Sequence, residues 1–336
     1  MATRRKRGRS GRSRALIGLL IVLAVVASFI VWQRRSTTSW TQAGPSAKAI
    51  DVTVPEGATL AAAARALEKA GAIPSTTRFL RDARRFGGDE PIKAGDYEVP
   101  PRASEKDVLA LLQSGKTVQR LVTIPEGMPA VLVRERLMAQ PLLTGDVPVP
   151  AEGSVLPDSY SFEKGESRAA VLKRMQAAMT RTLDQLWKTR TPASVVQSKH
   201  DALTLAAIVE KETAKASERR TVAAVYSNRL RQGMKLQADP TVIYPITQGR
   251  PLGRRIRRSE LNAVNGYNTY AKAGLPQGPI ANPGKESIAA VLDPAPSKAL
   301  YFVADGTGGH VFASTLAEHN ANVQKWYALR RQRGEM

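Results

Sequence analysis

An apolar run near the N-terminus constrains this chain more than any other feature. Between Ala15 and Trp32, 16 of 18 residues are apolar. As an α-helix rising 1.5 Å per residue, the run would be about 27 Å long, close to the roughly 30 Å hydrocarbon core of a bilayer. The sequence therefore predicts a transmembrane helix over residues 15–32.

The charges on either side of this run predict its orientation. Seven Lys or Arg residues and no acidic residue precede it within residues 1–14, whereas only Arg34 and Arg35 follow it closely. By the positive-inside rule, residues 1–14 form a basic cytoplasmic tail and the chain beyond the helix is exported. A cleaved signal peptide is the alternative, because Val25-x-Ala27 could serve as a cleavage site, but the apolar run continues beyond it. We expect a single-pass protein of the cytoplasmic (inner) membrane with periplasmic domains.

Composition narrows the classes of function. The 336 residues are 43% apolar, which is enough for about two folded domains, and the absence of cysteine excludes disulfides and thiol chemistry. The net charge of +21 is typical of nucleic-acid binders, but nine basic residues lie in the first 35, leaving 41 basic against 29 acidic residues beyond. With an exported topology, an anionic polymer or a lipid surface fits this excess better than nucleic acid.

The first exported segment predicts a linker and a small α/β module. Residues 33–48 are mostly small and polar, as expected of a linker. Residues 49–118 then open with an alternating strand over 50–54, followed by a helix capped by Thr59 and ended by Gly71. A strand over 95–99 and a helix around 108–112 complete the module.

A short phrase occurs twice, 70 residues apart. Residues 52–57, with the sequence VTVPEG, are matched by residues 122–127, with the sequence VTIPEG. The repeat predicts the same strand, turn and helix in both places. Glu56 and Glu126 are most simply turn residues, because a charged residue between Pro and Gly is typical of a turn.

The remaining segment, 119–336, predicts a mixed and largely helical domain. Helices are expected over 168–187, from 203 onward, from about 217 to 233, and over 315–330, with a strand over 300–303. Residues 233–283 are rich in Gly, Pro and Asn, which favours loops over this scaffold. The fold class expected of the whole chain is α+β, with short strands and long loops.

Chemistry can be assigned largely by exclusion. Three dispersed histidines do not have metal-site spacing, and no Walker loop, GxGxxG or GxSxG motif is present, so neither a metal nor a cofactor is expected. Carboxylates remain, above all Glu210 and Glu212 at the end of an otherwise apolar helix. Two residues apart on a helix they point away from each other, so they are not a catalytic pair. A partly desolvated carboxyl there could act as a general acid, although a solvated helix end is the simpler interpretation.

Several longer motifs carry a family resemblance. The run LAAIVEKETAKASERRTVAAVYSNRLRQGMKLQADPTVIY over 205–244 is followed by YNTY over 267–270, GLPQGPIANPG over 274–284 and YFVADGTGGHVF over 301–312. Together with Leu156-Pro157-Asp158, residues 122–127 and the apolar anchor, they closely resemble the endolytic murein transglycosylase family, also called YceG-like. The resemblance covers nearly the whole chain and implies a LysM-like module over 49–118 and a catalytic domain over 119–336.

The resemblance implies particular roles for residues. Glu212, the second glutamate of the EKE triplet, corresponds to the family's catalytic acid, with Glu210 and Glu218 in supporting roles. Four residues in the matched loops are candidates for sugar binding, although each could instead only shape its loop: Gln237, Asp239, Asn268 and Tyr270. His310 and His319 are expected to be local hydrogen-bonding or core groups. The partners implied are peptidoglycan glycan strands, the membrane and peptidoglycan synthases.

Two other functions stay open at this point. A lysozyme-like muramidase would use Asp239 as a second carboxylate and would add water to the cleaved bond. A non-catalytic scaffold of the wall-synthesis machinery would use residues 50–118 to bind glycan. The transglycosylase hypothesis differs from both in predicting an internal cut of nascent strands that leaves a 1,6-anhydro end.

Overall fold

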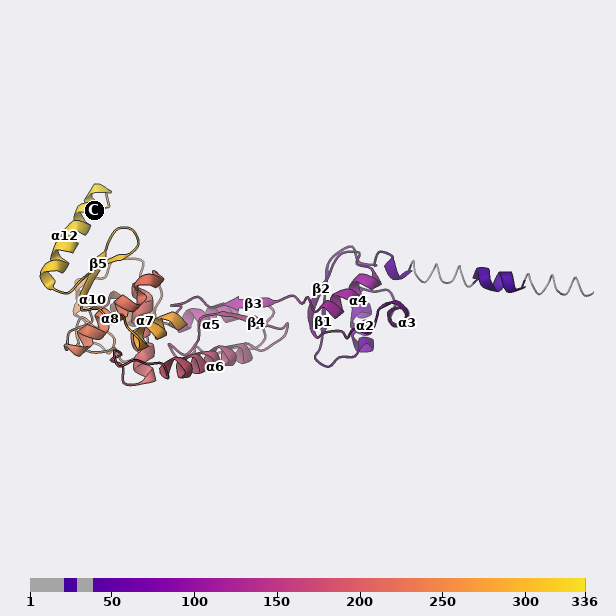
Figure 1. The fold of residues 1–336 in the computed structure, drawn as a ribbon, viewed down its shortest axis with the longest axis horizontal. Helices are drawn as coiled ribbons and strands as arrows, with labels where there is room; N and C mark the ends of the chain where they lie inside the picture. The colour runs from indigo at the N-terminus through magenta and orange to yellow at the C-terminus, as the bar shows by residue number, and fades with distance from the viewer. Residues whose placement is uncertain (1–20, 29–38, 336) are drawn as a thin grey trace, which may run out of the picture. The chain divides into compact units, whose positions relative to one another are not determined.

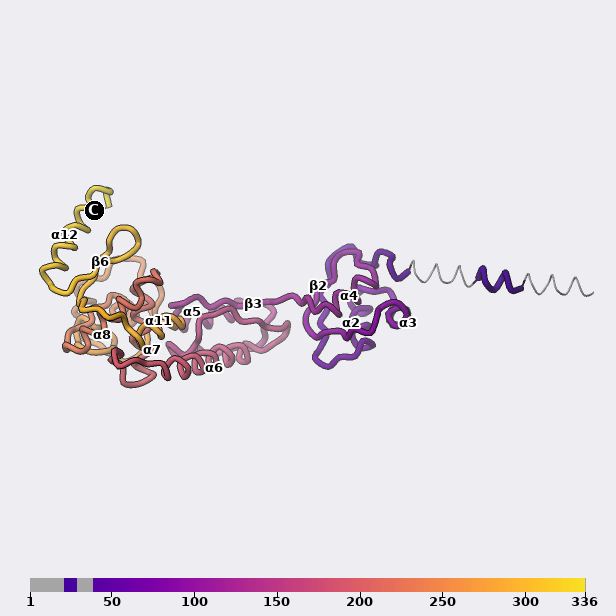
Figure 2. The backbone as a smooth tube through the Cα atoms, viewed as in Figure 1, coloured from indigo at the N-terminus to yellow at the C-terminus, as the bar shows by residue number. Residues whose placement is uncertain are grey.

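The computed structural model describes residues 21–28 and 39–335, and the chain divides into two compact units (Figures 1 and 2). One unit ends at Gln119 and the other begins at Arg120. Of the predicted transmembrane segment, residues 21–28 are α-helical, and the rest lies outside the described residues. Within the described ranges, no helix combines the length and apolar character needed to cross a bilayer.

The first unit is a small α/β module. Strand β1 (Ile50–Val54) pairs antiparallel with β2 (Gly95–Val99), with Ile50 opposite Val99. Helices α2 (Leu60–Lys69) and α3 (Thr76–Phe86) connect the two strands, and α4 (Glu105–Ser114) follows them. The predicted Thr59 cap is confirmed, since its side chain accepts a hydrogen bond from the Ala62 backbone N–H.

The segment predicted as a linker belongs in part to this module. Trp40 is buried and packs against Phe79 and Phe86, with ring centroids 6.1 and 6.2 Å away. The Gly44 N–H donates to the Arg102 carbonyl at 3.0 Å, which ties the same segment to the loop after β2. Residues 39–48 therefore differ from the expectation, because one large aromatic side chain outweighs the polar composition around it.

The repeated phrase forms the same local structure in both units. The second copy begins within strand β3 (Arg120–Thr123) and is followed by helix α5 (Ala130–Met138). In the same way, the first copy begins within β1 and is followed by α2. In each turn the glycine has a positive φ, +73° at Gly57 and +71° at Gly127, which glycine adopts without steric cost. The glutamates thus occupy turns, as predicted.

The second unit begins with a layer of strand and helix. Strand β3 pairs antiparallel with β4 (Ser159–Phe162), and α6 (Arg168–Trp187) follows β4. The bounds of α6 match the prediction, and its four-residue apolar spacing becomes its buried face, formed by Val171, Met175, Met179 and Leu183. The first half of this face, Val171 and Met175, builds a local core with Val122 of β3 and with Val133 and Leu137 of α5, whereas Met179 and Leu183 belong to a second core.

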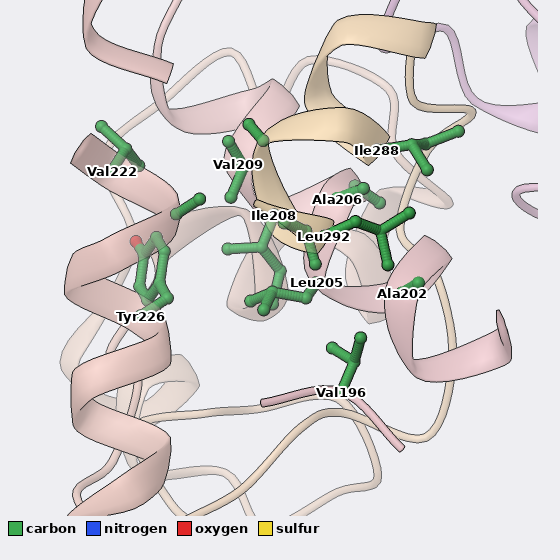
Figure 3. Close-up of a cluster of buried hydrophobic side chains, with 14 of the residues drawn as sticks. Val196, Ala202, Leu205, Ala206, Ile208, Val209, Val222, Tyr226, Ile288 and Leu292 are labelled. Carbon is green, nitrogen blue, oxygen red and sulfur yellow. The ribbon is translucent and has the colours of Figure 1, made fainter. Parts of the chain in front are cut away.

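A second core surrounds helix α7 (Lys199–Glu212). This helix packs against α8 (Arg219–Arg231) and α11 (Lys285–Leu292), and the short 3₁₀ helix η1 (Ala216–Glu218) leads into α8. Figure 3 shows Leu205, Ile208 and Val209 of α7 facing side chains of α8 and α11. Apolar residues occupy α7 almost continuously from Leu205 to Val209 because neighbours enclose it on several sides.

The remaining elements surround this core. Strand β5 (Tyr301–Ala304) pairs antiparallel with β6 (His310–Ala313), and α12 (Leu316–Gln332) packs on both. The segment predicted as loops contains two helices, α9 (Asp239–Thr247) and α10 (Arg258–Asn262). Pro240 is compatible with a helix because it lies in the first turn of α9, so the abundance of proline in this segment does not exclude helices. The described chain is thus a mixed α+β protein that is mostly helical with short strands.

Candidate active site

A cleft of about 330 Å³ lies at the C-terminal end of α7. It contains one acidic side chain from α7 and another from the start of α9, with polar and aromatic groups around them. Its lining residues are Glu212, Tyr226, Arg229, Leu236, Gln237, Asp239, Tyr270, Phe302 and His319. Three of the four candidate sugar-binding residues therefore share a cleft with Glu212.

Glu212 is the acid of this cleft whose pKa is raised. It is the last residue of α7, where unpaired backbone carbonyls disfavour a negative charge. Its Oε1 atom is buried and has no hydrogen-bond partner among the described residues, while the Tyr226 hydroxyl donates to the carboxyl group. Burial raises the pKa of Glu212 to about 7, against the hydrogen bond from Tyr226, and the nearby Asp239 carboxylate adds to the rise. Such a carboxyl is protonated in a large fraction of molecules near neutral pH.

Arg229 supplies a buried positive charge beside this acid. Its guanidinium donates to three backbone carbonyls, those of Leu300, Lys235 and Leu236, at 2.7, 3.2 and 2.8 Å. It also donates to the Gln237 side-chain oxygen at 3.2 Å and lies over the Tyr301 ring. Because these partners are neutral, the charge of Arg229 is free to stabilise a carboxylate at Glu212 after proton transfer.

The opposite wall is formed by the segment that leads into α9. Gln237 has a φ of +54°, which is strained for a residue with a side chain, and its N–H donates to the Thr269 carbonyl at 3.2 Å. Behind it, the hydroxyls of Thr241 and Thr269 are 2.8 Å apart and buried. The Tyr270 hydroxyl donates to Asp239 Oδ1 at 2.6 Å, which fixes both side chains at the cleft. Buried polar contacts therefore hold this wall in place.

Glu210 lies outside this cleft, as the helical spacing predicts. Its Oε2 accepts a hydrogen bond from the Gly284 N–H at 2.9 Å, and its Oε1 lies 3.9 Å from Arg219. The same arginine lies 3.7 Å from Glu126 of the second PEG turn. Glu210 thus joins the end of α7 to the loop before α11 and to the start of α8, and its supporting role stays a prediction.

Asn268 and Glu218 are also absent from the cleft lining. The buried Asn268 side-chain amide donates to the carbonyls of residues 260, 261 and 263, and its oxygen accepts from the Tyr270 N–H. The structure therefore favours the alternative in which Asn268 only shapes the loop. Glu218 is bonded to the His310 Nδ1 atom at 2.8 Å and the His310 N–H at 3.1 Å, which links η1 to β6.

Sequence reasoning missed several residues of the cleft. Neither the residue patterns nor the resemblance predicts a role for Tyr226, Arg229 or Phe302, all of which line the cleft. One signal was present: Arg229 follows Val222 and Tyr226 at helical spacing, so a charged residue shares the buried face of α8. His319, expected to be local, lines the cleft while its ring stacks on Tyr301 at 5.2 Å.

Comparison with known proteins identifies the family of this chain. A profile of the YceG-like family matches residues 52–325, which include every residue of the cleft. The chain belongs to the YceG-like family. A solved structure of a putative YceG-like protein from Listeria monocytogenes is similar, with 28% identity and a TM-score of 0.52, covering 82% of this chain and 98% of that one.

Two curated relatives of this YceG-like chain are both named endolytic murein transglycosylase. The protein of Bacillus subtilis strain 168 is 27% identical over 316 residues, covering 84% of this chain and 86% of the relative. The protein of Streptococcus pneumoniae strain D39 is 30% identical over 327 residues, covering 83% of this chain but 58% of the longer relative. These names agree with the family that the sequence motifs resemble.

Proposed function

We propose that this protein is a peptidoglycan lytic transglycosylase that uses Glu212 as its acid and base. The observation that carries the proposal is the Glu212 carboxyl, whose pKa is raised to about 7 in a cleft lined with hydrogen-bonding groups. The names of the two relatives support the reaction class. The bond cleaved is the one between N-acetylmuramic acid and N-acetylglucosamine.

In the first step, protonated Glu212 donates its proton to the oxygen that links the two sugars. The C1–O bond of the muramoyl residue breaks, and positive charge develops on that sugar. The raised pKa keeps the carboxyl protonated before the step, which is what a general acid requires. The Asp239 carboxylate, held by the Tyr270 hydroxyl, is placed to stabilise the developing positive charge.

In the second step, the same carboxylate takes the proton of the muramoyl C6 hydroxyl. The C6 oxygen bonds to C1 and closes a 1,6-anhydro ring, so no water is consumed. Tyr226 and Arg229 stabilise the Glu212 carboxylate between the two steps. An attacking hydroxyl on the substrate itself has a high effective concentration, which lowers the entropic cost of this step.

Replacement of Glu212 by Gln tests this assignment. We expect Glu212→Gln to lower the release of 1,6-anhydro-muropeptides from purified murein by at least about a hundredfold, because general acid–base catalysis commonly contributes that much. Glu210→Gln is the matched control, since an amide oxygen can still accept the Gly284 N–H and Glu210 lies outside the cleft. Unchanged release by folded Glu212→Gln protein would refute the role of Glu212.

A muramidase is the second candidate, and one observation favours it. Asp239 shares the cleft with Glu212, so the two carboxylates that a hydrolase needs are both present. Mass spectrometry separates the two reactions, because hydrolysis adds one water to the products and transglycosylation adds none. Reducing ends in place of anhydro ends would favour the muramidase.

For location, we propose a single-pass anchor formed by residues 15–32 with the catalytic unit outside the cytoplasm. The apolar run and its basic flank support this topology. Residues 33–38 would leave at most about 20 Å of extended chain between the anchor and the docked Trp40 segment. Such a short tether favours glycan close to the membrane, such as strands still leaving the synthases, and the α/β module is a candidate glycan-binding part.

Topology and strand choice can be tested separately. A reporter that is active only outside the cytoplasm should be active when it is fused after residue 48. An anchorless, exported protein of residues 36–336 should fail to restore the strand-length distribution of the full protein at equal abundance. Full restoration would contradict the proposed role of the anchor.

A further inference from the structure

A second and larger cleft lies in the catalytic unit. Its volume is about 500 Å³, and its walls come from the second PEG turn, α5, α9 and the 249–252 segment. Apolar side chains dominate, among them Leu132, Ile243 and Leu252. None of the steps assigned to Glu212 uses this space.

At two places, consecutive residues of the chain line different clefts. Lys211 lines the larger cleft, and Glu212, the next residue, lines the smaller one. Likewise Pro240 lines the larger cleft and Asp239 the smaller. Because consecutive Cα atoms are about 3.8 Å apart, the linings of the two clefts come close to each other at these two places.

Hydrogen bonds through one partly buried carboxyl group, that of Glu152, hold the walls of the larger cleft together. Glu152 accepts from the Ala130 N–H at 2.9 Å and from the Tyr244 hydroxyl at 3.2 Å. The Asn282 side chain, whose oxygen accepts from the Val155 N–H, lies 3.4 Å from the same carboxylate. Glu152 therefore joins the start of α5, helix α9 and the loop before α11, so the cleft has fixed walls.

The chemistry of murein indicates what would lie there. Each muramoyl residue carries a stem peptide on its lactyl group, so the sugar whose bond is cut at Glu212 brings a peptide with it. This peptide offers alanine methyl groups, backbone amides and free carboxylates. The cleft offers mostly apolar walls, with Glu126 in its lining and the exposed cations Lys211 and Arg250 at its edge. Of the two cations, Arg250 is paired with Glu135. Lys211 has no carboxylate within ion-pair distance in the described part of the chain, so it is available to one from a ligand.

Resting on the proposed function, we propose that this larger cleft binds the stem peptide of the muramoyl residue at the cleavage site. Leu132, Ile243 and Leu252 contact the alanine methyl groups, and Lys211 pairs with a carboxylate. Bound in this way, the peptide positions the scissile bond at Glu212. The enzyme then prefers glycan that still carries peptides over bare glycan.

A comparison of two substrates and two variants tests the proposal. The substrates are uncross-linked glycan strands with intact stem peptides and the same strands stripped by an N-acetylmuramoyl-L-alanine amidase. Leu252→Glu puts a carboxylate into the cleft, where it repels those of the peptide. Val264→Glu is the matched control, because Val264 is exposed and does not line either cleft.

We expect the full-length wild type to have a kcat/KM at least about tenfold higher on peptide-bearing strands, equivalent to one well-placed contact. Leu252→Glu should lose that preference while keeping its activity on stripped strands, which also shows that the variant is folded. Val264→Glu should behave as wild type. Equal use of both substrates by the wild type, or an equal loss on both in Leu252→Glu, overturns the stem-peptide site. Failure of the proposed function is distinct, because the wild type would then release no fragments with 1,6-anhydro ends from either substrate.

Discussion

Glu210 and Glu212 show how the environment sets the role of a side chain. Both are glutamates in the last turn of α7, yet one is bonded to a backbone N–H and lies near Arg219, whereas the other has a buried oxygen without a partner. Burial raises the pKa of Glu212 to about 7 because the charged form loses hydration that the cleft replaces only in part. Glu212 is therefore suited to donate a proton near neutral pH.

The pH dependence of activity should follow this carboxyl. We expect kcat/KM to fall as the pH rises above about 7, because the acid is then lost from the free enzyme. The hydrogen bond from Tyr226 lowers the pKa of Glu212, so Tyr226→Phe should raise that pKa and move the alkaline limb to higher pH. A pH profile of both proteins measures the shift, and a limb that moves to lower pH would contradict the assignment.

The same carboxyl should affect stability in a predictable direction. The folded protein holds this proton more tightly than the unfolded chain between pH 4.5 and about 7, so ionisation at higher pH costs stability. Glu212→Gln removes that cost and should raise the free energy of unfolding by about 1–3 kcal/mol near pH 8. Near pH 4 the gain should vanish. Urea unfolding at the two pH values measures it, and a loss of stability at the higher pH would argue against a desolvated carboxyl.

At the scale of elements, α7 and the start of α9 form the frame of the site. The Ser198–Asp201 capping box begins α7, and the helix ends at Glu212, so its length places the acid at the cleft. Helix α9 begins at Asp239, just after the strained Gln237. Two buried threonines join this start to the 268–270 loop, which brings Tyr270 to Asp239.

Breaking the threonine pair should therefore affect both stability and catalysis. Thr269→Val removes the acceptor of the Ala238 N–H and the partner of the Thr241 hydroxyl. We expect a loss of about 1–3 kcal/mol in the free energy of unfolding, the usual cost of buried polar groups left unpaired, together with a lower kcat. The exposed Thr180→Val on α6 is the control and should change stability by less than about 0.5 kcal/mol. A Thr269→Val protein with wild-type kcat would show that this contact does not position the wall.

At the scale of the whole molecule, each unit has its own core. The first unit buries Trp40, Leu67, Phe79 and Tyr97 around its two strands, and the second has the cores of α6 and α7. All residues of both clefts lie in the second unit. The binding and catalysis proposed for the two clefts would thus be contained in one separately packed part of the chain.

A protein of residues 120–336 should therefore fold by itself. We expect a single cooperative thermal transition and helical circular dichroism, because cores of this kind are the basis of independent domains. It should also cleave soluble glycan strands at a rate comparable to that of the full chain. Loss of the transition on removal of residues 1–119 would show that the first unit is needed for folding.

Local sequence signals determined much of this protein. The bounds of α6, the Thr59 cap, strands β1 and β2 and the paired PEG turns follow from side-chain periodicity and turn chemistry, which act over a few residues. The motifs around Glu212 also indicate the family from the sequence alone. The opposed directions of Glu210 and Glu212 required only the pitch of a helix.

Only the tertiary structure decided which distant residues meet. The Tyr226 hydroxyl at Glu212 and the burial of Trp40 depend on packing between different elements of the fold. The burial of Asn268 depends on how the 260–268 segment folds back on itself. Helix α9 was missed because Pro240 and the polar residues around it are typical of loops when taken alone. Desolvation of a carboxyl is likewise a property of its surroundings, so the sequence indicates a candidate acid, but only the fold raises its pKa.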